Sequence, residues 1–318
     1  MNVRISAIIC TLSRANYLRK SINSLIGQTL SATHYEILIV DNGSTDNTSE
    51  VVIREYDDVQ NLRYVYEPIL GLSQARNTGW RQAVGEYVAY LDDDAIAYPQ
   101  WLEKILHVFE TIKPKPACVG GRIEPLWETA RPPWLSDKIA RCLGVLDLSD
   151  SPMTLDDSHW LFGGNSAYPR HLLETVGGFQ TSLGRKGNKL LSNEETLLYQ
   201  QLKQRGYHYY YHPEVAIRHH VPSFRLTKSW LIRRWYWQGV SDAVAAIHLA
   251  SPPTLKRLWM GISAVINLLR SPQGLVYLIV PTKNPDRFAL KCAISRKTGY
   301  IVGLSRIVKW SSRSNAVE

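Results

Sequence analysis

Apolar runs and helical patterns alternate along the first hundred residues of the 318-residue chain. The runs at 5–10, 37–40 and 87–91 are short and nearly continuous, which is typical of strands buried on both faces, and 62–65 is a further strand-like run. After the first run, Leu18, Ile22 and Leu25 recur at helical spacing, and Gly71 begins a helical pattern that continues to about residue 83. This alternation predicts an α/β fold with a mostly parallel central sheet that is covered by helices.

The middle of the chain has a different pattern. Residues 113–157 are rich in Pro and Trp and show no sustained periodicity, which predicts binding loops or a lid. Further on, 160–162 and 207–211 have strand-like runs, whereas 171–176 and 193–205 have helical spacing. Beyond residue 251, short amphipathic stretches are mixed with basic residues, and we expect a mainly helical, basic and amphipathic extension over 241–318.

Composition and charge narrow the class of protein. A hydrophobic content of 45% excludes a disordered or fibrous chain. The net charge of +9 is unevenly distributed, because residues 201–318 contain 18 Lys and Arg against 4 Asp and Glu. A basic segment rich in Trp and Tyr can contact nucleic acid, anionic lipid or a phosphorylated substrate, or it can be a solvated surface. No nucleic-acid recognition motif accompanies the charge, so we expect no nucleic-acid partner and infer peripheral contact with an anionic membrane.

The cysteines and the apolar runs bear on the compartment. The four cysteines lie far apart without a CxxC pair, which argues against a disulfide scaffold or a zinc site. The first apolar run lacks a cleavage-site pattern and is better explained as a strand than as a signal peptide. No run reaches the length of a transmembrane helix. We therefore expect a cytoplasmic protein, which can also lie at the inner face of the plasma membrane.

Three adjacent carboxylates, Asp92, Asp93 and Asp94, directly follow the apolar run at 87–91. They repel one another, and this favours a bound cation or an arginine beside them. Mg²⁺ and Mn²⁺ take oxygen ligands and can also bind the phosphates of a substrate. The alternative is a solvated turn with a capping aspartate.

Asp41 also directly follows a buried run, at 37–40. Its carboxylate can accept hydrogen bonds from a pyrimidine or a ribose, or it can close an Asx-turn with its own backbone. In parallel sheets, ligands bind beyond the carboxyl ends of the strands, where both Asp41 and the aspartate triplet fall. Their shared position favours a binding site.

Arg76 lies in the second turn of the helical pattern that begins at Gly71. The start of a helix attracts phosphate, and the arginine can also compensate the charge of the aspartates. The alternative is a surface arginine on an amphipathic helix.

Two further pairs of residues are candidates for proton transfer or metal binding. Glu194 and Glu195 begin a helix, where acidic residues are also expected from the helix dipole alone. Either carboxylate can act as a general base toward an acceptor hydroxyl. His219 and His220 offer nitrogen ligands or a proton-transfer group, although single histidines more often have structural roles.

These motifs occur in one order along the chain. Residues 7–11 read Ala-Ile-Ile-Cys-Thr and precede Arg14, 40–46 read Val-Asp-Asn-Gly-Ser-Thr-Asp, and 71–79 read Gly-Leu-Ser-Gln-Ala-Arg-Asn-Thr-Gly. Residues 91–95 read Leu-Asp-Asp-Asp-Ala, 163–167 Gly-Gly-Asn-Ser-Ala, 177–179 Gly-Gly-Phe and 193–196 Asn-Glu-Glu-Thr. In this order and spacing, the chain from about Ile5 to Gly239 resembles the family 2 glycosyltransferases.

The resemblance implies a GT-A fold, which is a Rossmann-like α/β sandwich, over residues 1–240. It divides this domain into a nucleotide-binding half at about 1–112 and an acceptor half at 113–240, followed by the extension at 241–318. It also implies an inverting transfer from a nucleotide diphosphate sugar, often a UDP-sugar, with Mn²⁺ or Mg²⁺. We expect the acceptor to be a glycan or a lipid-linked sugar of surface or extracellular polysaccharide synthesis.

Roles for the donor side follow from the matching positions. Asp41 resembles the nucleoside-binding aspartate, and Thr11 and Arg14 lie where the first loop of the family contacts the nucleotide. Asp92 and Asp94 resemble the outer members of the DxD motif, Asp94 as the direct metal ligand and Asp92 nearer the ribose or Arg76. Asp93 lies between them and is assigned to the nucleotide.

Roles for the acceptor side are less uniform. Gly163, Gly164 and Asn165, with Trp160 before them, resemble the segment beside the transferred sugar and the acceptor. Glu195 matches the position of the base, but this chain has Glu-Glu where Glu-Asp is frequent, so the choice between Glu194 and Glu195 stays open. His220 resembles a histidine that approaches the metal or the diphosphate, and His219 is an alternative.

Two other functions compete with glycosyl transfer. A nucleotide-sugar-binding protein of the same fold without catalysis is compatible with the Glu-Glu departure. A nucleotidyltransferase would have a glycine-rich phosphate loop after the first strand, but residues 11–14 contain no glycine. The sequence therefore predicts an inverting glycosyltransferase, with the inactive binding protein as the alternative.

Overall fold

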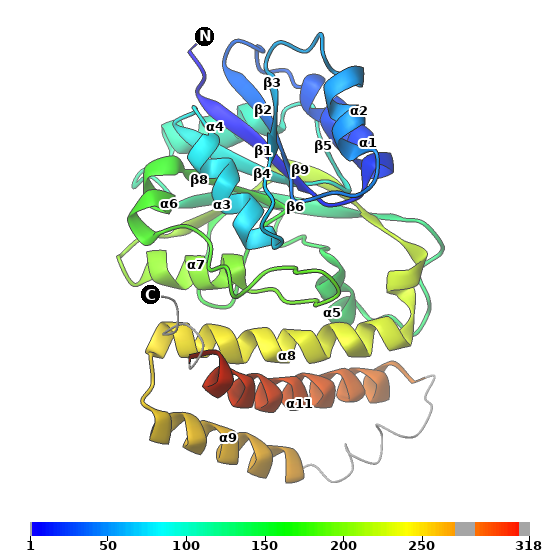
Figure 1. The fold of residues 1–318 in the computed structure, drawn as a ribbon, viewed down its shortest axis with the longest axis vertical. Helices are drawn as coiled ribbons and strands as arrows, with labels where there is room; N and C mark the ends of the chain where they lie inside the picture. The colour runs from blue at the N-terminus through cyan, green and yellow to red at the C-terminus, as the bar shows by residue number, and fades with distance from the viewer. Residues whose placement is uncertain (1, 271–283, 312–318) are drawn as a thin grey trace. The chain divides into compact units, whose positions relative to one another are not determined.

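The structure is a computed structural model that describes residues 2–270 and 284–311 (Figure 1). The chain forms two compact units. The first contains the residues up to Leu126 together with Gly144–Thr181 and Glu194–His220, and the second contains Trp127–Leu143, Ser182–Asn193 and the chain from Val221 onward. The predicted domain boundary at residue 240 falls inside a helix of the second unit, and the domain division stays a prediction.

The first unit begins with the predicted alternation of strands and helices. In chain order, the elements are β1 Ile5–Thr11, α1 Ala15–Ile26, β2 Tyr35–Asp41, α2 Thr48–Glu55, β3 Leu62–Tyr66, α3 Leu72–Gln82 and β4 Tyr87–Asp92. Every residue of β2 is buried, which is the physical reason for its continuous apolar run. The expected α/β fold with a central sheet is confirmed.

The remaining elements of the first unit complete the sheet. They are β5 Ala95–Ala97, α4 Trp101–Thr111, β6 Cys118–Trp127, β7 Met153–Thr154, β8 Asn165–Pro169, α6 Arg170–Val176, α7 Glu194–Lys203 and β9 Tyr209–Val221. The last residues of β6 and β9, Trp127 and Val221, fall in the second unit. The strand order is β3-β2-β1-β4-β8-β6-β9-β5, and β7 pairs with β9. Pairing is parallel from β3 to β4 and antiparallel for the β4–β8, β6–β8 and β5–β9 pairs, so the sheet is mixed.

Two local predictions in the acceptor half are wrong. Residues 118–127 form the strand β6 inside the region that we expected to be irregular. Two glycines allow the backbone of β6 to approach its neighbouring strands closely. A Cβ on Gly120 would lie 2.5 Å from the carbonyl oxygen of Asn165, and one on Gly121 would overlap the carbonyls of β9. Residues 160–162 are not a strand, because the pairing with β4 begins only at Asn165. The strand expected at 207–211 begins at Tyr209 and extends to Val221.

Helices make up most of the second unit that the structure describes. They are α5 Asp137–Ala140, the 3₁₀ helices η1 Arg141–Leu143 and η2 Ser223–Leu226, and the long helices α8 Lys228–Ala250, α9 Thr254–Leu269 and α11 Pro285–Ser311. The expected helical C-terminal part is therefore confirmed.

The helices α8 and α11 run side by side in the same direction (Figure 1). Gly239 of α8 and Gly299 of α11 allow their backbones to touch, because a Cβ on either would overlap the other helix. Over the described ranges, no helix has both the length and the apolar character needed to cross a membrane.

Candidate active site

The carboxyl ends of β1, β2 and β4 lie level with one another. Thr11 is paired with Asp41 between β1 and β2, and Cys10 is paired with Asp92 between β1 and β4. The polar residues that end these strands therefore share one edge of the sheet, where ligands bind in open α/β folds.

Asp41 is almost fully buried at this edge. One carboxylate oxygen accepts a hydrogen bond from the backbone N–H of Ser44 at 2.8 Å, and the other accepts one from the Tyr64 hydroxyl at 2.7 Å. Burial and the adjacent carboxylate raise the pKa of Tyr64 above its ordinary value, so this hydroxyl keeps its proton for the bond. Asp41 closes the turn after β2, and its contact with a nucleoside stays a prediction.

The aspartate triplet forms a tight turn between β4 and β5 in which the side chains diverge. Asp93 and Asp94 are buried, whereas the side chain of Asp92 is 40% exposed. The hydroxyl of Ser21 on α1 lies 2.8 Å from the carbonyl oxygen of Asp93 and 2.6 Å from that of Ala95. This contact fixes the turn against α1.

Arg14 compensates the two buried carboxylates. Its Nη1 lies 2.6 Å from Asp93 Oδ1 and 2.9 Å from Asp94 Oδ2, and Thr11 donates a hydrogen bond to Asp93 Oδ2 at 2.8 Å. Burial raises the pKa of Asp93 to about 6, with Arg14 opposing the shift and the charge of Asp94 adding to it. Burial also disfavours the charge on Arg14, but the two carboxylates raise its pKa above the ordinary value. Both carboxylate oxygens of Asp93 therefore have protein partners, Arg14 and Thr11.

His219 reaches Asp94 through the antiparallel pairing of β5 with β9, in which Ala95 is paired with His219. Its Nε2 lies 3.3 Å from Asp94 Oδ1. Asp92, Asp94 and His219 each offer one ligand atom, and these atoms lie within 4.8 Å of one another. Two ligands on opposite sides of one Mg²⁺-sized ion are roughly 4.2 Å apart, so this donor set fits a divalent cation with little adjustment.

His220 points to a different neighbour. The centroid of its ring lies 4.9 Å from that of the Tyr17 ring. The guanidinium of Arg14 also contacts Tyr17, at 5.4 Å from the ring centroid. The backbone N–H of His220 donates to the carbonyl oxygen of Asp94 at 2.9 Å, and the histidine in the candidate cation site is His219. Tyr17 was not among the residues expected from the sequence, although it lies in the first turn of α1, three residues after Arg14.

Arg76 is buried between Asp92 of the aspartate triplet and Glu194 at the start of α7. Its Nη1 donates to Glu194 Oε1 at 2.7 Å, and its Nη2 lies 3.7 Å from Asp92 Oδ1. The rings of Tyr90 and Phe179 flank the guanidinium at 5.8 and 5.5 Å. Arg76 lies beside Asp92, as compensation of the triplet requires, but its stronger partner is Glu194, 118 positions away.

Gly163 and Gly164 pack on this ion pair. A Cβ on Gly163 would lie 2.6 Å from Arg76 Nη1, and one on Gly164 would overlap the Asp92 carboxylate. The side chain of Asn165 accepts a hydrogen bond from Trp101 Nε1 at 2.8 Å and donates one to the carbonyl of Val215 at 2.9 Å. Asn165 therefore anchors the sheet, while Trp160 is 41% exposed. Sugar contact by these four residues stays a prediction.

Glu195 is the remaining carboxylate at the start of α7. Its Oε2 is buried and makes no hydrogen bond to any residue that the structure describes. Burial raises the pKa of Glu195 to about 8, with the charge of Glu194 adding to the shift and that of Arg76 opposing it. Glu194 is paired with Arg76, and Glu195 beside it is a buried carboxyl whose pKa is raised into the neutral range.

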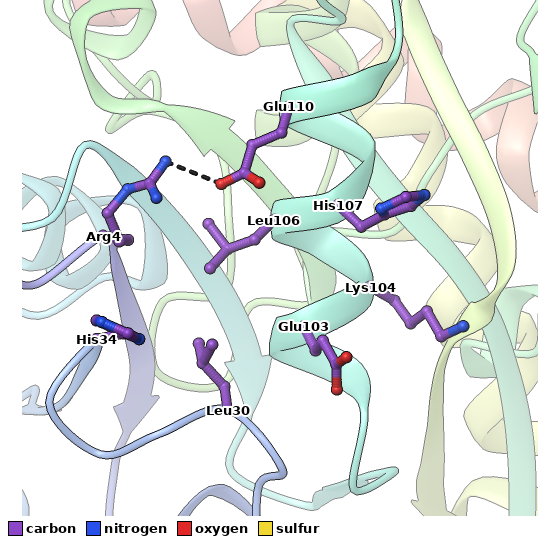
Figure 2. Close-up of a pocket in the computed structure, with 8 residues that line it drawn as sticks. All are labelled: Arg4, Leu30, His34, Glu103, Lys104, Leu106, His107 and Glu110. Carbon is purple, nitrogen blue, oxygen red and sulfur yellow. Dashed lines mark hydrogen bonds and ion pairs between the residues drawn. The ribbon is translucent and has the colours of Figure 1, made fainter.

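A pocket of about 410 Å³ lies elsewhere in the first unit (Figure 2). Its lining residues are Arg4, Leu30, His34, Glu103, Lys104, Leu106, His107 and Glu110. Arg4 and His34 precede β1 and β2, so the pocket lies at the amino ends of parallel strands, opposite the site described above. Two of its basic side chains already form ion pairs, Arg4 with Glu110 and Lys104 with Glu214, both at 2.8 Å. We assign it no role.

Comparison with known proteins identifies relatives of this chain. The family described as "Glycosyl transferase family 2" matches residues 6–177. A glucosyl-dolichyl phosphate glucuronosyltransferase of Haloferax volcanii is 27% identical over 247 residues, which cover 76% of this chain and 77% of that protein.

Solved structures agree on the fold. The mannosyltransferase PcManGT from Pyrobaculum calidifontis, solved with GDP-Man and Mn²⁺, has a TM-score of 0.56 at 19% identity, covering all of this chain and 77% of that one. TarS 1–349 of S. aureus, solved with UDP, has a TM-score of 0.50 at 16% identity, covering 97% of this chain and 92% of that one. The family match extends over more than half of the chain, and both structural neighbours share its α/β architecture. The chain therefore belongs to glycosyl transferase family 2 and is a glycosyltransferase with a GT-A fold.

Proposed function

We propose that the protein transfers a sugar from a nucleotide diphosphate sugar, a UDP-sugar, to an acceptor hydroxyl with inversion at the anomeric carbon. The observation that carries the proposal is the continuous polar chain His219–Asp94, Asp92–Arg76 and Arg76–Glu194, next to Glu195. It connects a candidate cation site to a candidate base. Asp41, Thr11, Arg14 and Asp93 are the proposed nucleotide-binding residues around it.

On the donor side, Asp92, Asp94 and His219 would hold Mn²⁺ or Mg²⁺. When bound, such a cation supplies Lewis-acid neutralisation of the diphosphate leaving group. Support comes from the PcManGT structure, which contains Mn²⁺ with GDP-Man, and from TarS, which contains UDP. Arg14 holds Asp94 in position, and Arg76 does the same for Asp92.

On the acceptor side, Glu195 takes the proton of the acceptor hydroxyl while the oxygen attacks the anomeric carbon. A new glycosidic bond forms as the bond from that carbon to the diphosphate breaks, and the diphosphate leaves with the bonding electrons. Arg76 commits Glu194 to an ion pair, which supports Glu195 as the base. The low polarity around Glu195 makes its carboxylate a stronger base than an exposed one.

The pH profile of kcat/KM should rise with pH and level off above about 8. A base must be ionised to act, and burial raises the pKa of Glu195 to about 8, so each pH unit below that value should lower the rate about tenfold. Glu195→Gln should lower the plateau value of kcat/KM by about 10²- to 10⁴-fold and remove the part of the pH dependence that Glu195 causes. Initial-rate measurements between pH 6 and about 9.5 would check both expectations.

Glu174→Gln is the matched control, because Glu174 is exposed on α6 and should keep the wild-type profile. An unchanged kcat in Glu195→Gln would exclude Glu195 as the base. A wild-type profile that is flat over this range would contradict the raised pKa even if the variant is inactive.

The acceptor is proposed to be a glycan or a sugar linked to a lipid phosphate, as in the assembly of surface or extracellular polysaccharide. Support is the Haloferax relative, whose name is glucosyl-dolichyl phosphate glucuronosyltransferase. The proposed compartment is the cytoplasm, and the four free cysteines fit its reducing conditions.

The donor class can be tested by equilibrium binding to a panel of UDP-, GDP- and dTDP-sugars with and without Mn²⁺. We expect a UDP-sugar to bind more tightly with Mn²⁺, and transfer or slow hydrolysis of that donor to follow. Binding of GDP-sugars alone would contradict the UDP assignment. Metal-dependent binding without either reaction would instead favour an inactive nucleotide-sugar-binding protein.

A further inference from the structure

One face of α9 is apolar along the length of the helix. We call it the α9 stripe; its exposed residues recur at spacings of three and four positions and include Leu255, Leu258, Trp259, Ile262, Ile266 and Leu269. Leu255 is 70% exposed and Trp259 is 64% exposed, and none of the sixteen residues of α9 is buried. Contiguous exposed apolar surface of this kind marks a contact site for a partner or a membrane.

The opposite face of α9 makes the contacts within the second unit. Met260 packs against a small cluster formed by Ala243, Ile247 and Leu304 of α8 and α11. Ala264 and Leu268 follow Met260 at helical spacing and are likewise half-buried. Successive helical residues are rotated by about 100°, so this inner face lies across the helix from the α9 stripe. Figure 1 shows α9 lying beside α11 with its other side turned away.

The charges next to the α9 stripe have one sign. Lys256 and Arg270 are exposed, Arg257 is half-buried, and residues 251–270 contain no Asp or Glu. On the helix surface, Lys256 and Arg270 lie at one margin of the stripe. An apolar strip edged by cations matches the two layers of an anionic bilayer surface, which are acyl chains below and phosphate headgroups above. The rest of the C-terminal region is also strongly basic.

The length of α9 decides how such a contact can be made. Sixteen residues of helix extend over roughly 24 Å, whereas about 20 apolar residues are needed to span the hydrocarbon core. The helix can therefore lie in the interface but cannot cross it. A second copy of the chain is a poorer occupant, because symmetric pairing of two α9 helices would bring the cations of both copies together.

We propose that the α9 stripe binds the surface of an anionic lipid bilayer, with the helix axis parallel to the membrane plane and Lys256 and Arg270 at the headgroups. The residues of the α9 stripe belong to the second unit, whereas the acidic cluster and Glu195 belong to the first, and the proposal does not depend on the proposed transferase mechanism. It gives the enzyme a means of meeting an acceptor that is anchored in the bilayer.

Flotation of the full-length protein with vesicles tests the proposal. The two probes are phosphatidylcholine vesicles and vesicles of equal parts phosphatidylcholine and phosphatidylglycerol, at low and high salt. The variant Trp259→Gln/Ile262→Gln should weaken partitioning into the anionic vesicles by about 100-fold, because two exposed apolar side chains lose their burial. Ile53→Gln/Val84→Gln removes two exposed apolar side chains from the first unit and should float like the wild type.

The proposal would be overturned if the wild type floated with neither kind of vesicle, or if the Trp259→Gln/Ile262→Gln variant floated as well as the wild type. It would also be overturned if the wild type bound no vesicles but self-associated, and the variant abolished this self-association. Metal-dependent binding of UDP-sugars should be the same in both double variants and the wild type. A failure of donor binding in all proteins would therefore count against the proposed function and not against the membrane surface.

Discussion

Asp94→Asn should lower kcat/KM by about a thousandfold and abolish tight Mn²⁺ binding. Asp94 is the buried carboxylate of the candidate cation site and lies 3.3 Å from His219 Nε2. Neutralising it removes a charged ligand, and the charge stabilisation that a metal gives to a leaving diphosphate amounts to several kcal/mol. At roughly 1.4 kcal/mol for each factor of ten, about 4 kcal/mol corresponds to this loss. Titration of Mn²⁺, followed by the electron paramagnetic resonance signal of the free ion, measures binding independently of turnover.

The matched control for Asp94→Asn is Asp58→Asn, which changes an exposed aspartate after α2. It should bind Mn²⁺ and turn over like the wild type. His219→Ala should weaken Mn²⁺ binding, whereas His220→Ala should leave the affinity for Mn²⁺ within about a factor of two or three, because the candidate donor set contains the His219 ring beside Asp92 and Asp94. Unchanged Mn²⁺ affinity in Asp94→Asn, or a loss in His220→Ala alone, would refute this ligand set.

Arg76→Met should lower the free energy of unfolding by about 3–5 kcal/mol. The substitution leaves Glu194, which is 4% exposed, without the guanidinium that neutralises it at 2.7 Å, and an unpaired buried carboxylate is strongly destabilising. It also removes the support of Asp92 and the surface on which Gly163 packs. Urea-induced unfolding, extrapolated linearly to water, measures the change.

Two variants separate the buried ion pair from a general effect of losing an arginine. Arg54→Met removes an exposed arginine that pairs with Glu50 on α2 and should cost less than about 1 kcal/mol. Arg76→Met/Glu194→Gln removes both charges and should recover part of the stability, because no ionised carboxylate remains at that position. If Arg76→Met were as stable as Arg54→Met, the buried pair would not have the structural importance that its geometry indicates.

Much of the nucleotide-binding half could be predicted without tertiary information. The strands β1, β2 and β4 are buried runs rich in β-type residues, and α1 shows apolar residues at helical spacing, so these elements are specified by their own neighbours in sequence. The common edge of Asp41 and Asp92 then follows from parallel pairing alone, since the carboxyl ends of such strands meet.

The acceptor half could not be predicted in the same way. The strand β6 has a weak apolar pattern because two of its buried positions are Gly120 and Gly121, which bring its backbone close to β8 and β9. The long strand β9 was recognised only at its start, because Pro213 and Glu214 interrupt its apolar pattern. Its second part pairs with the three-residue strand β5, which is too short to have a pattern of its own.

The sequence by itself determined that this chain has the motifs of a family 2 glycosyltransferase, with three aspartates at a strand end and two glutamates at a helix start. Only the tertiary structure distinguished His219 from His220 and Glu194 from Glu195. His219 joins Asp94 because the β5–β9 register places it there, and Glu194 is bound to Arg76 while Glu195 is left in a buried position that raises its pKa. Adjacent identical residues have the same local pattern, and what separates them is the partner that the fold brings from about a hundred residues away.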